Sequence, residues 1–148
     1  MGDLVSTALY DTDYYKWTKE QAGLLRDGRM TSLDIEHLIE ELENMGARER
    51  RELANRLVVL LVHLLKWQFQ PERRGNSWRR TIKAQRMEIA DLLSDNPSLK
   101  SEMSNVLDRA YKKARFYAVD ETNLAENTFP HALPYPPDDL LDDEYWPQ

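Results

Sequence analysis

Residues 57–86 read LVVLLVHLLKWQFQPERRGNSWRRTIKAQR. The first part of this stretch is apolar almost without interruption, and Pro71 follows it. Because proline cannot continue a helix and biases the residue before it away from helical angles, we expect a helix to end near Gln70. Apolar residues then return at helical spacing among basic ones. The stretch therefore predicts a helical hairpin with polar groups gathered at its closed end.

A helical period also runs through most of the chain on either side of this hairpin. Gly, Pro and capping residues divide it into about five expected helices, which cover residues 14–27, 31–45, 48–70, 76–95 and 97–121. Gly46 marks an expected break or bend between the second and the third. The third is apolar nearly all round in its second half, so we expect it to be the central helix of a bundle. With no convincing strand, the predicted fold class is all-α.

The chain of 148 residues is long enough to build a real core, and we expect a single helical domain over residues 1–148. Residues 1–9 are expected to be disordered. From about residue 122 the helical period fails and the chain becomes Pro-rich and acidic, which predicts an extended tail. The aromatic residues Phe129 and Tyr135 favour packing of this tail on the bundle. Because the apolar run 57–62 is far too short to span a bilayer, we expect no membrane contact.

Charge is distributed unevenly along the sequence. The net charge is -6, but residues 63–90 hold seven Lys or Arg against two Glu, a local balance of +5. Residues 120–148 hold eight acids and no Lys or Arg, a local balance of -8. The acidic total disfavours a general nucleic-acid coat, and the two regions have the charges to pair with each other.

The hairpin contains the candidate functional residues: His63, Lys66, Trp67, Gln70, Arg73, Arg74, Trp78, Arg79, Lys83 and Arg86. Imidazole titrates near neutral pH, so one interpretation makes His63 a general acid or base, or a ligand. The interpretation that we favour is a hydrogen-bonded core histidine, because the sequence places no Ser, Cys or Asp partner beside it. Trp67 is more typical of hairpin packing than of a ligand platform.

Arg79, Lys83 and Arg86 form a basic stripe at i, i+4 and i+7. Beside tryptophans, such a stripe can bind phosphates and stack bases. It can equally pair with the acidic tail or with an acidic helix face, and we favour pairing within the protein or with a protein partner.

That acidic face belongs to the second expected helix and consists of Glu36, Glu40, Glu41 and Glu43. A bundle that binds two iron ions needs Glu-x-x-His pairs, and the sequence contains none. We therefore expect a solvated face, no metal and no cofactor. Because the chain has 0 Cys, disulfides and thiolate metal sites are excluded.

Several motifs resemble a known bacterial family, domain of unknown function 29. They are LYDTDYYKW at 9–17, EE at 40–41, HLLKW at 63–67, QP at 70–71, SWR at 77–79, TI at 81–82 and FP at 129–130. The resemblance covers roughly residues 9–145. It implies a small, all-helical, cytoplasmic bacterial protein, and it supplies no activity, cofactor or catalytic residue.

Three functional hypotheses follow from these patterns. The first is a protein-interaction module with a basic hairpin surface and an acidic tail, acting on an unknown protein partner. The second is a nucleic-acid-binding protein that uses the Arg/Lys stripe of the fourth helix. The third is a hydrolase or nuclease that uses His63 with a carboxylate of the acidic helix. The oligomeric state stays open, and the sequence leaves it undecided whether the tail covers the basic helix.

Overall fold

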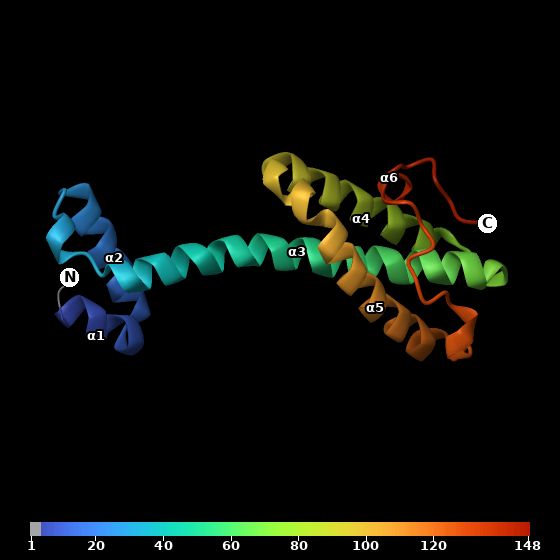
Figure 1. Cartoon of the computed structure of the whole chain (residues 1–148), viewed down its shortest axis with the longest axis horizontal. Helices are drawn as coiled ribbons and strands as arrows, with labels where there is room; N and C mark the ends of the chain where they lie inside the picture. Colours follow the sequence, from blue (N-terminus) through green and yellow to red (C-terminus); the bar gives the residue numbers. More distant parts are fainter. Residues whose placement is uncertain (1–3) are drawn as a thin grey trace. The chain divides into compact units, whose positions relative to one another are not determined.

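Helices make up most of the computed structural model, which describes residues 4–148 (Figure 1). They are α1 (Leu4–Thr12), α2 (Tyr14–Arg26), α3 (Ile35–Phe69), α4 (Asn76–Asp95), α5 (Met103–Thr122) and α6 (Pro137–Leu140), joined by short 3-10 turns. The described residues contain no strand. The prediction of an all-α fold is therefore confirmed.

The chain divides into two compact units, Met1–Arg48 and Glu49–Gln148. The physical reason lies in α3, whose residues 42–49 are all exposed. Buried side chains therefore fall into two separate groups, which we describe one at a time.

Helix α3 runs without interruption through Gly46, so of the two expected alternatives, a break or a bend, the break is wrong. Glycine lowers helix stability by about 1 kcal/mol relative to alanine but can still adopt helical angles. A Cβ added at Gly46 would meet no atom within 4 Å. No close approach of the backbone therefore explains this glycine, and its neighbours outweigh its weak helix propensity.

Unit 1 contains α1, α2 and the beginning of α3. One face of α2 supplies its buried residues Trp17, Gln21 and Leu24. Gly28 follows α2 with φ +72, a left-handed angle that glycine adopts without steric cost. Helix α1 includes residues for which the sequence analysis expected disorder. The expectation was based on the helical period alone, which does not show contacts with distant residues such as that of Tyr10 with Glu41 of α3. Residues 1–3, also part of that expectation, lie outside the described residues.

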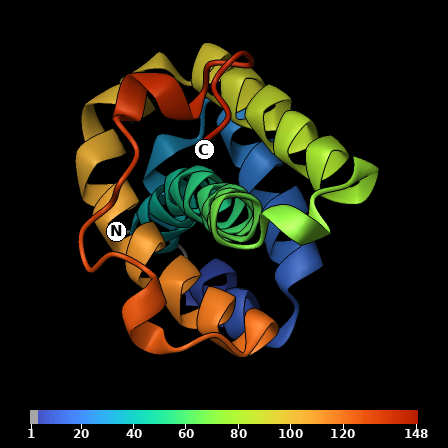
Figure 2. The ribbon, with the colours of Figure 1, turned by 90° about the vertical axis from the view of Figure 1, so that its right-hand side faces the viewer.

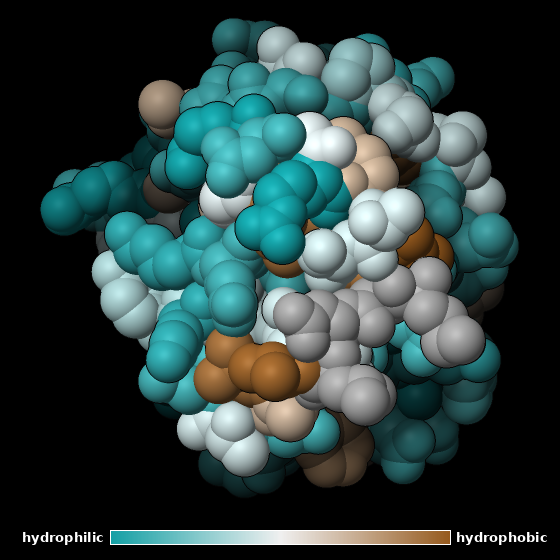
Figure 3. Space-filling view, turned by 90° about the vertical axis from the view of Figure 1, so that its left-hand side faces the viewer, coloured by the Kyte–Doolittle hydropathy of each residue, from teal (hydrophilic) through white to brown (hydrophobic). Residues whose placement is uncertain are grey.

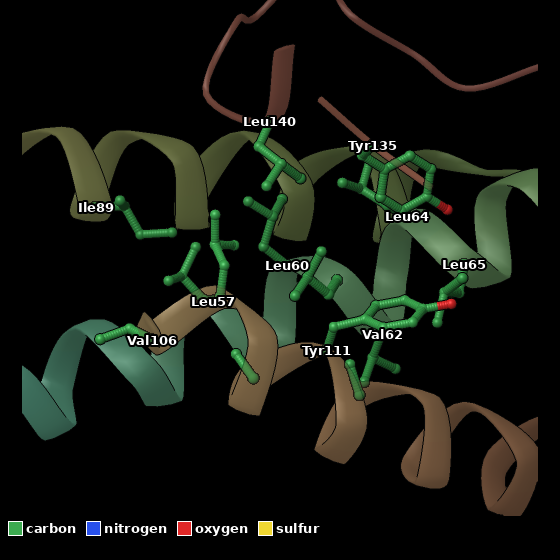
Figure 4. Close-up of a cluster of buried hydrophobic side chains, with 14 of the residues drawn as sticks. Leu57, Leu60, Val62, Leu64, Leu65, Ile89, Val106, Tyr111, Tyr135 and Leu140 are labelled. Atoms are coloured by element: carbon green, nitrogen blue, oxygen red, sulfur yellow. The ribbon is translucent and has the colours of Figure 1, made fainter. Parts of the chain in front are cut away.

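Unit 2 contains the rest of α3, together with α4, α5 and the tail, which lie around it (Figure 2). Its core is built on leucines of α3, of which Leu57, Leu60 and Leu64 have no exposed surface. Tyr111 of α5 and Tyr135 of the tail meet the same cluster (Figure 4). Apolar burial on this scale is the main source of stability for such a helical unit.

The tail segment contributes buried residues to unit 2 in its own right. The exposed fractions of Phe129, Tyr135 and Leu140 are 1%, 2% and 0%. The Tyr111 hydroxyl donates a hydrogen bond of 2.5 Å to the Pro130 carbonyl. Residues from 129 onward are thus held by apolar contacts and by hydrogen bonds to the backbone.

Candidate functional sites

A buried carboxylate organises the polar centre of unit 1. Asp34, which immediately precedes α3, has 3% of its surface exposed. Its Oδ2 accepts hydrogen bonds from Trp17 Nε1 at 2.9 Å and from His37 Nδ1 at 2.6 Å. Its backbone N–H donates to Gln21 Oε1 at 2.8 Å. These contacts tie α2 to the first turn of α3.

The electrostatics of this centre favour a charged Asp34–His37 pair. Burial alone would raise the pKa of Asp34, but hydrogen bonds from His37 and Trp17 outweigh it and leave that pKa below its usual value. The hydrogen bond to Asp34 raises the pKa of His37. The sequence signal that could have identified the pair is the Asp-x-x-His spacing at a helix start.

A second carboxylate, Glu41, lies one turn beyond His37 along α3. It accepts a hydrogen bond of 2.5 Å from the Tyr10 hydroxyl and another from the Tyr14 hydroxyl. These bonds lower the pKa of Glu41 and raise that of Tyr10. The Tyr10 ring also stacks on His37, with ring centroids 3.9 Å apart. Glu41 therefore joins α1, α2 and α3, whereas the other members of the predicted acidic face, Glu36, Glu40 and Glu43, are exposed.

The carboxylates of Asp34 and Glu41 are thus occupied by protein donors. Over residues 4–148, no group of three or more His, Asp or Glu side chains is placed to hold a metal ion. The face of unit 1 in Figure 3 is mostly hydrophilic, with hydrophobic colour confined to small patches.

An apolar stripe remains exposed on α3 within unit 1. It consists of Ile35, Ile39, Leu42 and Met45, whose exposed fractions are 49%, 50%, 66% and 55%. Their spacing of i, i+4, i+7 and i+10 places them along one helix face. The exposure of this face depends on tertiary packing, which a periodic sequence pattern does not show.

In unit 2, His63 and Lys66 each have a partner near the end of α3. The His63 ring donates from Nδ1 to the Val59 carbonyl at 2.8 Å, and burial lowers the pKa of its imidazole. Lys66 Nζ forms an ion pair of 2.8 Å with Glu121. No carboxylate hydrogen-bonds to His63 among the described residues, so these contacts give the hydrolase hypothesis no support.

Trp67 lies under the turn of the hairpin. Arg74 donates from Nε to the Trp67 carbonyl at 2.6 Å. The guanidinium carbons of Arg74 and Arg79 lie 5.1 and 5.3 Å from the centroid of the Trp67 ring. The ring of Trp146 lies 4.8 Å from that of Trp67. Trp67 therefore packs between basic side chains and the tail.

Arg86 contacts the tail instead of solvent. Its exposed fraction is 2%, and it donates from Nε to the Leu140 carbonyl at 2.7 Å and from Nη2 to the Tyr145 carbonyl at 2.8 Å. Burial lowers the pKa of Arg86, while the charges of Asp143 and Asp142 raise it. The predicted stripe is thus divided, with Arg86 buried and Arg79 and Lys83 exposed.

The remaining hairpin candidates differ in exposure. Gln70 is 7% exposed, Trp78 is half-buried with Lys66 Nζ 5.9 Å from its ring centroid, and Arg73 is exposed. A cleft of about 360 Å³ next to the hairpin is lined by Arg79, Lys83, Met87, Asp143, Glu144 and Trp146. Its walls therefore carry both signs of charge.

The sequence analysis did not predict a basic face that the structure shows on α5. It consists of Arg109, Lys112, Lys113 and Phe116, at i, i+3, i+4 and i+7, and all four are exposed. Phe116 alone is 70% exposed. A cleft of about 590 Å³ next to it is lined by Lys112, Arg115, Phe116, Val119, Asp120, Glu126 and His131. The sequence signal was three basic residues, at 109, 112 and 113, followed by the aromatic Phe116 at the same helical spacing.

These features define an all-helical protein whose buried charged groups are held by its own side chains and carbonyls. The chain belongs to the family described as "Domain of unknown function DUF29", whose model matches residues 9–146. Comparison with curated proteins and with solved structures found no match. Among the described residues, no helix is both long and apolar enough to cross a membrane.

Proposed function

We propose that this chain is a protein-interaction module. The observation that carries the proposal is the exposed stripe of Ile35, Ile39, Leu42 and Met45 on α3. Large apolar side chains aligned on one exposed helix face are typical of helices that dock with a partner. The exposed carboxylates of Glu36, Glu40 and Glu43 adjoin the stripe, as polar rims adjoin apolar interface centres.

The hairpin of unit 2 supports the same class of function. Arg86 already binds the tail, and the exposed Arg79 and Lys83 share a cleft with Asp143 and Glu144. Carboxylates beside the basic side chains repel a polyphosphate backbone but suit a protein surface of mixed charge. The basic hairpin surface and the acidic tail therefore form one mixed surface in this proposal.

Site-specific photo-crosslinking tests the proposal. A photoreactive amino acid replaces Leu42 in the stripe, and the matched control replaces Asn44, which is exposed on another face of the same helix. We expect discrete protein adducts in the native host from position 42 and few from position 44. Equal or absent crosslinking at the two positions would contradict the proposal.

Nucleic-acid binding is the second candidate, because Arg73, Arg79 and Lys83 are exposed around the half-buried Trp78. Fluorescence anisotropy with labelled single strands and duplexes across a salt series tests it. Phosphate binding weakens steeply with salt, and the Arg73→Ala/Arg79→Ala/Lys83→Ala variant should lose it. The matched control is Arg109→Ala/Lys112→Ala/Lys113→Ala, which removes the same charge from α5. Absence of salt-sensitive binding would eliminate this candidate.

A further inference from the structure

We propose that the apolar stripe of α3 docks on the basic face of α5 in a second copy of this chain. This inference rests on the protein-interaction function and names the partner. The apolar stripe is Ile35, Ile39, Leu42 and Met45, with its acidic rim Glu36, Glu40 and Glu43. The basic face is Arg109, Lys112, Lys113 and Phe116.

The two surfaces are complementary in charge and in polarity. The acidic rim carries three negative charges, and the basic face carries three positive charges around the exposed Phe116 ring. Within the described part of the chain, none of these six charged side chains takes part in an ion pair. Each surface therefore has apolar area and charges available to the other, and such complementarity favours selective docking.

The basic face also has a place for apolar side chains. The cleft of about 590 Å³ beside Phe116 is lined by Phe116 itself, Val119, Lys112 and Arg115, and also by His131 and the acidic residues Asp120 and Glu126. Leucine or isoleucine side chains that enter it would leave water, which is favourable at about 25 cal/mol per Å² of apolar surface. The four apolar residues of the stripe project from successive turns, as helices that bind grooves do.

The same charges disfavour two other possible partners of the apolar stripe, namely the stripe of a second copy and an anionic membrane. If the stripe of one copy met the stripe of another in an antiparallel pair, their acidic rims would lie on the same side, and like charges across an interface cost several kcal/mol. An anionic membrane surface would repel the rim in the same way. The contact uses two different surfaces, so two such contacts can close a symmetric dimer and a single one leads to an open chain of copies.

Charge reversal with complementation tests the inference. The first variant is Glu36→Lys/Glu40→Lys/Glu43→Lys, and the second is Arg109→Glu/Lys112→Glu/Lys113→Glu. All six positions are exposed, so both variants should fold, which far-UV circular dichroism checks. Light scattering after size-exclusion chromatography, over a wide concentration range, measures self-association.

We expect the native chain to self-associate as concentration rises, and each variant alone to do so at least about tenfold more weakly, because its two surfaces then carry like charge. An equimolar mixture of the two variants should restore association, since the reversed rim of one meets the reversed face of the other. A chain that combines both sets of substitutions should also associate with itself.

Three results of the charge-reversal experiment would overturn the inference. They are a native chain that stays monomeric throughout, variants that associate as the native chain does, and a mixture that fails to restore association. Crosslinks from position 42 to another protein, with a monomeric native chain, would overturn the inference and leave the interaction function standing. Absence of crosslinks from position 42 would overturn both.

Discussion

Replacing Arg86 with methionine tests how the tail is held on unit 2. Arg86 is buried and donates hydrogen bonds to the carbonyls of Leu140 and Tyr145, 54 and 59 residues further along the chain. Methionine has similar length and flexibility but no donor, so Arg86→Met removes both hydrogen bonds while filling most of the space.

The expected loss of stability follows from these contacts. A hydrogen bond that involves a charged group contributes about 1.5–3 kcal/mol, so the two bonds together contribute about 3–6 kcal/mol. Part of this is offset, because the variant no longer buries a guanidinium whose Nη1 lacks a hydrogen-bond partner. We expect Arg86→Met to destabilise unit 2 by about 2–4 kcal/mol, less than the stability of a typical domain.

Hydrogen exchange measured by mass spectrometry across a urea series reports on each unit separately. The tail around residues 140–146 should lose protection first and most strongly. Arg80→Met serves as the matched control, because Arg80 is exposed on the same helix and its loss should cost less than about 0.5 kcal/mol. If Arg86→Met matched this control and the tail stayed protected, the inferred role of Arg86 would be refuted.

Two further predictions concern glycines and histidines. Gly28→Ala should destabilise unit 1 by about 1–2 kcal/mol, since an L-residue is strained at its left-handed φ. Gly46→Ala should instead stabilise α3 by up to about 1 kcal/mol. Urea unfolding measures the change in free energy of unfolding for both variants, and changes of the same sign would contradict the argument. In an NMR titration, the pKa of His37 should lie above 6.5 and that of His63 below 6.5, because Asp34 stabilises the charged form of one and burial disfavours the charged form of the other. By linkage, the contribution of His37 to stability is present below pH 6.5 and is lost as pH rises through its folded pKa. His63, in contrast, lowers stability as pH falls below 6.5. The reverse order of the two pKa values would contradict both assignments.

Local signals in the sequence predicted element ends more reliably than element continuity. Pro71 marks the end of α3 at Phe69, and Pro97 follows the end of α4 at Asp95. Both ends are local, since proline lacks the N–H and has a fixed φ. Gly46 has an N–H and can adopt helical angles, so its low helix propensity is outweighed by the residues around it.

The candidate sites were harder to predict, because their partners are distant in sequence. The contact of Tyr10 with Glu41 spans 31 residues, and that of Arg86 with Leu140 spans 54. A periodic pattern shows which residues share a helix face but not what covers that face. Tyr117 of α5, for example, is 44% exposed, which the helical period alone does not show.

The acidity of the tail suggested that charge holds it in place, but the contacts of Arg86 indicate otherwise. Arg86 donates to the carbonyls of Leu140 and Tyr145, and no ion pair joins it to a carboxylate among the described residues. Asp142 and Asp143 are exposed, and screened charges of this kind contribute about 0–1 kcal/mol. We therefore expect Asp142→Asn/Asp143→Asn to leave the protection of the tail against hydrogen exchange nearly unchanged, in contrast to Arg86→Met. If neutralising the two aspartates released the tail as fully as Arg86→Met does, charge and not carbonyl binding would hold it.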